Sequence, residues 1–336
     1  MEWCNKPATS YAVHWVDPKE VNPPYTNVPI KADETYVRVT LVEMMLAKST
    51  AWFHDVQPSV QGLTRCKFGD QTIEIPSLAA PDGKQFPQRA VLRNFRLLDL
   101  IPFRGNSIEI TTALVSIAGD DKLANGIKAL SNVASLFSPP LGSALTAAEK
   151  LRDSIAMLAG DQSGVHLAYH NTFTAEPGGS QLQSGYLAIV GAAASELENV
   201  TPFVTNDSLA LRTANGPAPV GYDYMLLRFE VLANRDDMEN FSDIAAQREL
   251  AIASLLHDTP PVADLAYRTA LSTILLHKGL TNADRRVVAT ALKTELDGLK
   301  ATLGTRAAPP RAWKDVVKSL PLGTDHSPVH MHEFIR

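Results

Sequence analysis

The sequence predicts an α+β protein, in which an antiparallel β-sandwich-like domain carries an inserted helical hairpin and precedes a C-terminal helical region. Three observations lead to this prediction. Strand-like segments, rich in β-branched residues or alternating between apolar and polar ones, recur between residues 33 and 233 and are separated by turns. Residues 121–160 interrupt them with apolar residues at helical spacing. After residue 234 the periodic segments all have the helical period.

The predicted organisation begins with a proline-rich arm at residues 1–32. It contains no sustained period but holds Tyr11, Trp15 and Tyr25. The arm is either packed on the body or a mobile leader, and its aromatic residues favour packing because disordered segments are poor in them. We expect the β-sandwich-like domain at 33–233, the helical region at 234–304 and an extended tail at 305–336.

The strands of the first half are predicted at residues 35–46, 71–76, 91–101 and 107–118. Residues 52–63 are compatible with a strand or a short helix, and the pattern does not choose between them. Residues 76–87 read as a loop because Pro81-Asp82-Gly83 is a turn signal.

The hairpin is predicted from two runs of apolar residues at spacings of three and four, separated by Pro139 and Pro140. Residues 165–174 then return as a strand. No charged residue occurs between Lys128 and Glu149, which is about the length that crosses a hydrocarbon core. The prolines and several polar residues interrupt this run, so a packed hairpin that covers a sheet is the preferred prediction. Entry of residues 129–148 into a membrane is the alternative.

The second half adds strands at 185–191 and 222–233 and helices at 237–256, 261–277 and 282–303. Thr281 is the predicted N-cap of the last helix, with Asp284 at its third position and Gly304 beyond its end. In the tail, Trp313, Val316, Val317 and Leu320 predict a docking turn.

Composition restricts the function. The net charge of -5, without clustered Lys and Arg, argues against a nucleic-acid partner. Residues 1–6 lack a basic region followed by an apolar one, so no secretion signal is predicted. Cys4 and Cys66 are far apart and have no ligand-spaced neighbour, which excludes a disulfide framework and predicts free thiols in the cytoplasm.

The densest cluster of metal-ligand types lies in the tail, where His326, His330 and His332 accompany Asp325 and Glu333. Imidazole and carboxylate together suit Zn²⁺, Ni²⁺ or Cu²⁺, so a divalent metal ion is the candidate cofactor. A solvated or docked tail explains the same residues, and it is the preferred interpretation because metal geometry needs a firm frame.

Two aspartate pairs, Asp120-Asp121 and Asp236-Asp237, each follow a predicted strand. If the strand ends lie together, four carboxylates converge and suit Ca²⁺. The preferred interpretation is that each pair starts a helix. Four histidines have equally simple explanations, on the polar face of a strand or at helix C-termini: His166, His170, His257 and His277.

No nucleophile elbow, phosphate-binding loop, dinucleotide fingerprint or HExxH motif occurs. The leading hypothesis is therefore a non-catalytic interaction or regulatory protein, whose proline-rich ends and helical region contact a protein partner. The first alternative is a membrane-active effector that releases the uncharged hairpin. The second is a metal-dependent hydrolase that uses the C-terminal histidines.

Overall fold

The computed structural model describes residues 11–25, 28–46, 56–68, 70–79, 90–105, 107–118, 165–175, 180–213, 216–302 and 310–335. The predicted hairpin at 121–160, its candidate membrane segment at 129–148 and Asp120-Asp121 lie outside them. The chain divides into two compact units. The first, the sheet unit, comprises Met1–Ile30, Val37–Leu100 and Gly105–Val231, and the second, the helical unit, comprises Lys31–Tyr36, Ile101–Arg104 and Leu232–Arg336.

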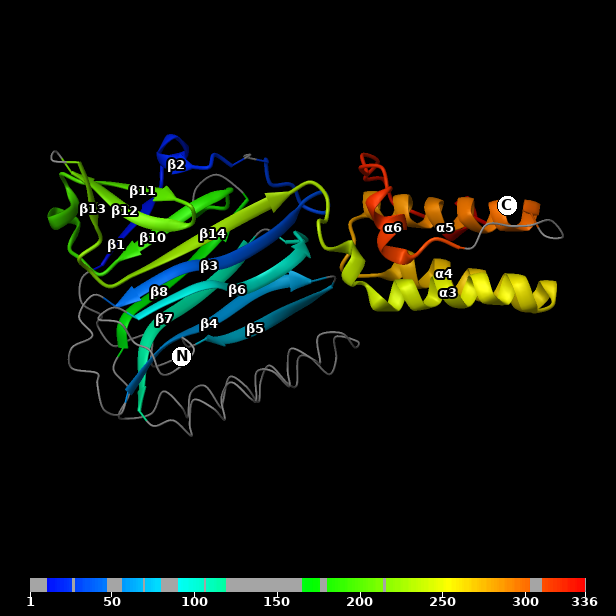
Figure 1. Ribbon diagram of the computed structural model, residues 1–336, viewed down its shortest axis with the longest axis horizontal. Helices are drawn as coiled ribbons and strands as arrows, with labels where there is room; N and C mark the ends of the chain where they lie inside the picture. Colours follow the sequence, from blue (N-terminus) through cyan, green and yellow to red (C-terminus); the bar gives the residue numbers. More distant parts are fainter. Residues whose placement is uncertain are drawn as a thin grey trace. The chain divides into compact units, whose positions relative to one another are not determined.

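Antiparallel sheets together with C-terminal helices confirm the predicted α+β class (Figure 1). Sheet A has the order β1 (Ala12–Trp15), β10 (Gly185–Val190), β14 (Tyr224–Leu232), β3 (Tyr36–Leu46) and β6 (Ala90–Pro102). Sheet B has the order β13 (Gly216–Pro219), β12 (Ser208–Thr213), β11 (Thr201–Thr205) and β2 (Val21–Asn22). Sheet C has the order β5 (Gln71–Ala79), β4 (Val56–Phe68), β7 (Ser107–Ala118), β8 (Val165–Thr174) and β9 (Ser180–Gln181). Two short 3₁₀ turns belong to this unit, η2 (Pro18–Glu20) and η3 (Ala194–Leu197).

The sheet unit has three layers, with sheet A between the other two (Figure 1). Residues of sheets A and B share one apolar cluster, in which Met45 and Leu226 accompany Leu209. Sheet C contacts the opposite face of sheet A, where the rings of Phe173 and Phe229 lie 4.8 Å apart. All eleven residues of β3 are buried, as expected for a strand of the middle sheet, which is covered on both faces.

Two strand predictions change in the structure. The undecided stretch at 52–63 contributes to a strand, since β4 runs from Val56 to Phe68. The strand predicted at 71–76 continues to Ala79, beyond Pro76. Proline is tolerated there because β5 is the edge of sheet C.

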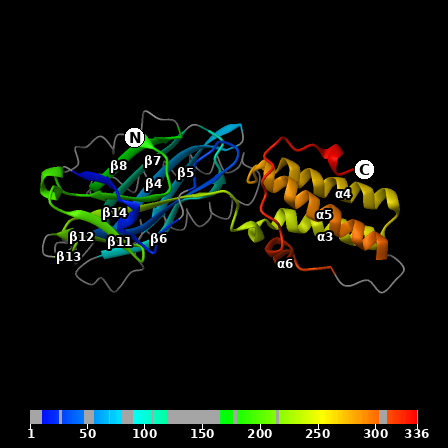
Figure 2. The same cartoon turned by 90° about the horizontal axis from the view of Figure 1, so that it is seen from above.

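The helical unit contains α3 (Ser242–His257), α4 (Pro260–Leu276), α5 (Asn282–Thr302) and α6 (Trp313–Lys318), with short 3₁₀ turns η4 (Met238–Asn240) and η5 (Met331–Glu333). Figure 2 shows the three long helices side by side. Their shared core includes Ile252, Leu271 and Leu292. The helix predicted from residue 237 begins at Ser242, because η4 and the non-helical backbone of Phe241 precede it.

One carboxylate lies inside the sheet unit. Glu43 of β3 accepts hydrogen bonds from the Tyr224 hydroxyl (2.6 Å), the Leu209 N–H (2.9 Å) and the Ser208 hydroxyl (3.1 Å), and it pairs with Arg93 (2.8 Å). These donors come from sheets A and B, so one side chain joins both layers. The buried charge is tolerated because its oxygens are paired.

We expect Glu43→Ala to lower the free energy of unfolding by about 3 kcal/mol, because the buried donors of Tyr224 and Leu209 lose their acceptor. Chemical denaturation measures the change. Asp99→Ala is the control, since Asp99 belongs to an exposed ion pair with Arg96 and should cost less than about 1 kcal/mol. Equal losses in the two variants would contradict the role assigned to Glu43.

Candidate functional site

A concavity runs along α5 in the helical unit. One face of α5, with Val288, Ala289, Leu292 and Leu296, packs into the core of the unit. The neighbouring face forms the floor of a groove, in which small side chains predominate beside Arg286, Glu295 and Leu299. The smaller side chains of the floor are Ala283, Val287, Thr290, Ala291, Thr294, Gly298 and Thr302. The sequence of α5 thus provides one apolar face for packing and one face, mainly of small residues, that leaves space.

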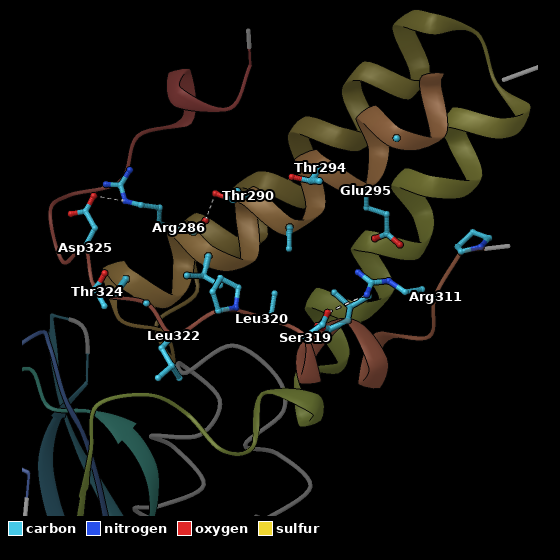
Figure 3. Close-up of a pocket in the computed structure, with 18 of the residues that line it drawn as sticks. Arg286, Thr290, Thr294, Glu295, Arg311, Ser319, Leu320, Leu322, Thr324 and Asp325 are labelled. Atoms are coloured by element: carbon cyan, nitrogen blue, oxygen red, sulfur yellow. Dashed lines mark hydrogen bonds and ion pairs between the residues drawn. The ribbon is translucent and has the colours of Figure 1, made fainter. Parts of the chain in front are cut away.

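The second wall of the groove is the chain that follows α5. It includes Pro310, Arg311 and Val316 and continues from Ser319 to Asp325 (Figure 3). The volume is about 720 Å³. Because a helix rises about 1.5 Å per residue, the floor from Ala283 to Thr302 is about 28 Å long.

Two glycines have contrasting surroundings at the two ends of the groove. A Cβ added to Gly298 would meet no atom within 4 Å, so this position opens into space. A Cβ added to Gly323 would lie 2.9 Å from the backbone carbon of Ala283. Glycine at 323 therefore lets the second wall touch α5 at the first turn, whereas near the last turn the space beside Gly298 is open.

Arg286 organises the end of the groove nearest the start of α5. Its guanidinium pairs with Asp325 (Nε to Oδ2, 3.1 Å) and with Glu333, and it donates to the Ser327 hydroxyl (3.0 Å). Hydrogen bonds from Ser327 and the charge of Arg286 lower the pKa of Asp325, which is ionised at neutral pH. Two carboxylates against one guanidinium leave this end with one net negative charge. We call it the acidic end.

The opposite end of the groove has the opposite charge. Glu295 is held by Arg248 through two bonds of 2.7 and 2.5 Å, so this pair is neutral. Arg311 donates to the Ser319 hydroxyl (3.1 Å), and no carboxylate of the described residues lies within ion-pair distance of it. Figure 3 shows Arg311 and Asp325 at opposite ends of the groove. We call the Arg311 end the basic end.

A buried polar cluster lies beside the acidic end, at the N-terminus of α5. Tyr36 donates its hydroxyl proton to Asp284 and accepts from the N–H of Thr281 (2.8 Å). Arg104 donates to the carbonyl of Leu280 (2.8 Å). Burial raises the pKa of Asp284, and burial next to Asp284 raises the pKa of Tyr36. The hydroxyl of Tyr36 and the carboxylate of Asp284 are bonded within the unit, so we interpret the cluster as the support that places the first turn of α5.

Thr281 has the role that the sequence predicts. Its hydroxyl accepts a hydrogen bond from the N–H of Asp284 (3.4 Å), as an N-cap does. The predicted docking turn near Trp313 is the helix α6, and its Val316 and the following Leu320 line the groove.

The predicted metal ligands of the tail occupy different surroundings. His330 and His332 stack with ring centroids 5.6 Å apart, whereas Asp325 and Glu333 are bound to Arg286. His326 contacts Asn282 through its backbone carbonyl. In the part of the chain that the structure describes, no group of three or more His, Cys, Asp or Glu side chains is arranged to hold a metal ion.

The remaining candidates are placed as follows. Asp237 pairs with Arg235 through bonds of 2.7 and 2.9 Å and precedes η4, and Asp236 is its neighbour in the chain. Because Asp120 and Asp121 are not among the described residues, the convergence of the two pairs stays a prediction.

The ring of His170 is hydrogen-bonded to Thr111 (2.9 Å), and the ring of His277 accepts from the N–H of Gly279 (3.1 Å). His166 lies 4.0 Å from Asp223, and His257 is the last residue of α3.

Within the described residues, none of the helices combines the length and apolar character needed to span a bilayer. The uncharged segment at 129–148 lies outside the described residues, so its entry into a membrane stays a prediction.

Fold and site together define an α+β protein with three layered sheets and a helical unit that carries an open, charge-polarised groove. No protein-family model matches the chain, and neither a curated protein nor a solved structure is significantly similar to it. The groove itself must therefore carry any inference about function.

Sequence reasoning missed the groove. The available signal was the run of small residues on α5, including a glycine inside a helix, where it costs about 1 kcal/mol relative to alanine. The second wall comes from residues 310–325, and a helical pattern does not indicate which later segment will lie beside it.

We expect Tyr36→Phe to lower the free energy of unfolding by about 2 kcal/mol, because Asp284 loses its donor and Thr281 its acceptor inside the cluster. Tyr267→Phe is the control, as Tyr267 makes one hydrogen bond, to the Phe334 carbonyl, at a half-buried site. Denaturant titrations of both variants compare the losses. A Tyr36→Phe loss no greater than that of Tyr267→Phe would show that the cluster does not support α5.

We expect Gly298→Ala to raise the free energy of unfolding by about 1 kcal/mol, because the new methyl meets open space and alanine favours the helix. Gly323→Ala is the matched opposite, since its methyl would collide with Ala283. In thermal unfolding, the midpoint of Gly298→Ala should rise and that of Gly323→Ala should fall. A destabilised Gly298→Ala would mean that the groove is closed at this position.

Proposed function

We propose that this is a non-catalytic protein-interaction protein and that the groove along α5 binds a peptide segment of a protein partner. The observation that carries the proposal is the shape and lining of the groove, which is about 28 Å long and floored by small side chains. A surface of this kind makes van der Waals contacts along its length, as helix- and peptide-binding grooves do.

The polar groups of the groove favour this function over the binding of a polar metabolite. The hydroxyl of Thr290 donates to the carbonyl of Arg286 (2.8 Å), and that of Thr302 donates to the carbonyl of Leu299 (3.0 Å). Sites for small polar ligands present several polar groups that converge on the ligand. Here these two threonines direct their protons into their own helix, which leaves their methyl groups for contact.

The lining also favours binding over catalysis. Among its described residues there is no His or Cys, Glu295 is held by Arg248, and the Ser319 hydroxyl donates to the Val316 carbonyl (2.8 Å). Nucleophilic catalysis needs a nucleophile within hydrogen-bond reach of a free base. The carboxylate of Glu295 and the hydroxyl of Ser319 are already hydrogen-bonded within the chain. This is expected of a surface that binds a partner and does not catalyse a reaction.

Exposed apolar side chains on the same unit support a protein partner as well. On α4, Leu265 is 65% exposed and Leu276 is 73% exposed. At helical spacing they lie with Val262 along one side of the helix. Exposed apolar side chains grouped in this way are typical of interaction surfaces.

Site-specific photocrosslinking in the native host tests the proposal. The crosslinking residue p-benzoylphenylalanine replaces Thr294, an exposed residue of the groove floor, and in a control protein it replaces Thr201, an exposed residue of β11 in the sheet unit. We expect the Thr294 protein to form an adduct that mass spectrometry maps to one segment of a partner.

A second substitution makes the result specific. Gly298→Phe should abolish the Thr294 adduct, because the ring occupies the groove at a position that is open in the native chain. Absence of an adduct, or the same adducts from Thr294 and Thr201, would refute peptide binding in the groove.

A further inference from the structure

The backbone of the floor restricts the conformation of a bound segment. The floor belongs to a continuous α-helix, Asn282–Thr302, whose backbone N–H and C=O groups are bonded within the helix. An extended peptide would find no free strand edge on this wall and would leave its own backbone groups unpaired there. A helix satisfies its own backbone, and a floor of small side chains lets it approach closely.

The charges restrict the direction of that helix. The acidic end, with Asp325 and Glu333 against Arg286, lies at the N-terminus of α5. The basic end, with Arg311, lies toward its C-terminus. Helices favour acidic residues in their first turn and basic residues in their last turn because of the helix dipole. A helix with this common arrangement matches both ends of the groove only when it lies antiparallel to α5.

We propose, resting on the function proposed above, that the segment bound in the groove is an amphipathic helix antiparallel to α5. Its acidic first turn lies at Arg311, and its basic last turn lies at Asp325 and Glu333. Its apolar face packs on the small side chains from Val287 to Gly298. The partner is therefore a protein with an exposed amphipathic helix whose charge changes from negative to positive along its length.

Selection from a displayed peptide library tests this proposal. The library consists of helices of about 18 residues, the length that spans the floor at about 1.5 Å per residue. Their apolar face is varied among Ala, Leu, Ile and Met, and their first and last turns are varied among Glu, Lys and Gln. The full-length protein is the bait, and Gly298→Phe is the counter-bait that removes peptides bound elsewhere.

We expect the enriched peptides to carry Glu in the first turn and Lys in the last. Fluorescence anisotropy then compares one enriched peptide with the same peptide after its end charges are exchanged. Arg311→Glu should weaken the enriched peptide by about two- to fivefold and strengthen the exchanged one by a similar factor. Lys314→Glu is the matched control, because it makes the same charge change at an exposed residue outside the lining and should change neither affinity by more than about 1.5-fold.

Each result has one meaning. The enriched peptides could show no charge preference and still fail to bind Gly298→Phe. That result would overturn the antiparallel, charge-directed helix but would leave peptide binding in the groove intact. Enrichment of the opposite order, with Lys first and Glu last, would overturn it in the same way. If no peptide prefers the protein over Gly298→Phe, this inference fails, and the Thr294 crosslink decides separately whether the groove binds a peptide.

Discussion

The hydrogen bond from Tyr36 to Asp284 is the constraint on which the helical unit depends. It joins residues far apart in the chain, and Arg104 from a third segment bonds to Leu280 in the turn before the same helix. Asp284 is only 3% exposed, so each polar atom of the cluster needs a partner that only these segments supply. The first turn of α5 is thereby held in one position. The groove begins in that turn, so the cluster also fixes the position of the acidic end.

A similar rule operates in the sheet unit at Glu43. A strand that is buried on both faces would usually hold apolar residues alone, yet β3 carries this carboxylate between two layers. Its donors come from strands of sheets A and B, so the ion can be paired only when both sheets are in place. Buried polar groups of this kind stabilise little in net terms, but they penalise any arrangement in which they are unpaired.

The groove is the opposite case, a place where the chain leaves apolar contact unmade. Large residues on the core face of α5 fill the unit, while Ala, Thr and Gly on the next face leave room for other atoms. Glycine at position 298 lowers the stability of the helix and makes no compensating contact within the chain. This cost is understandable when a bound partner occupies the space beside it. The charged ends then add direction to a surface that would otherwise accept a helix in either sense.

Local patterns in the sequence determined most of the secondary structure, because period and capping are properties of neighbouring residues. The strands at β7 and β8, the extent of α5 and the cap at Thr281 follow from such patterns. The stacking of three sheets, the pairing of Glu43 and the groove depend on residues distant in sequence, and no local period records which of them meet. His330 and Glu333 illustrate the limit: the sequence shows that they are close in the chain, but the folded tail stacks one ring on His332 and directs the carboxylate to Arg286. The sequence alone determined which elements form, and the tertiary structure decided which surfaces they bury, because burial depends on long-range packing.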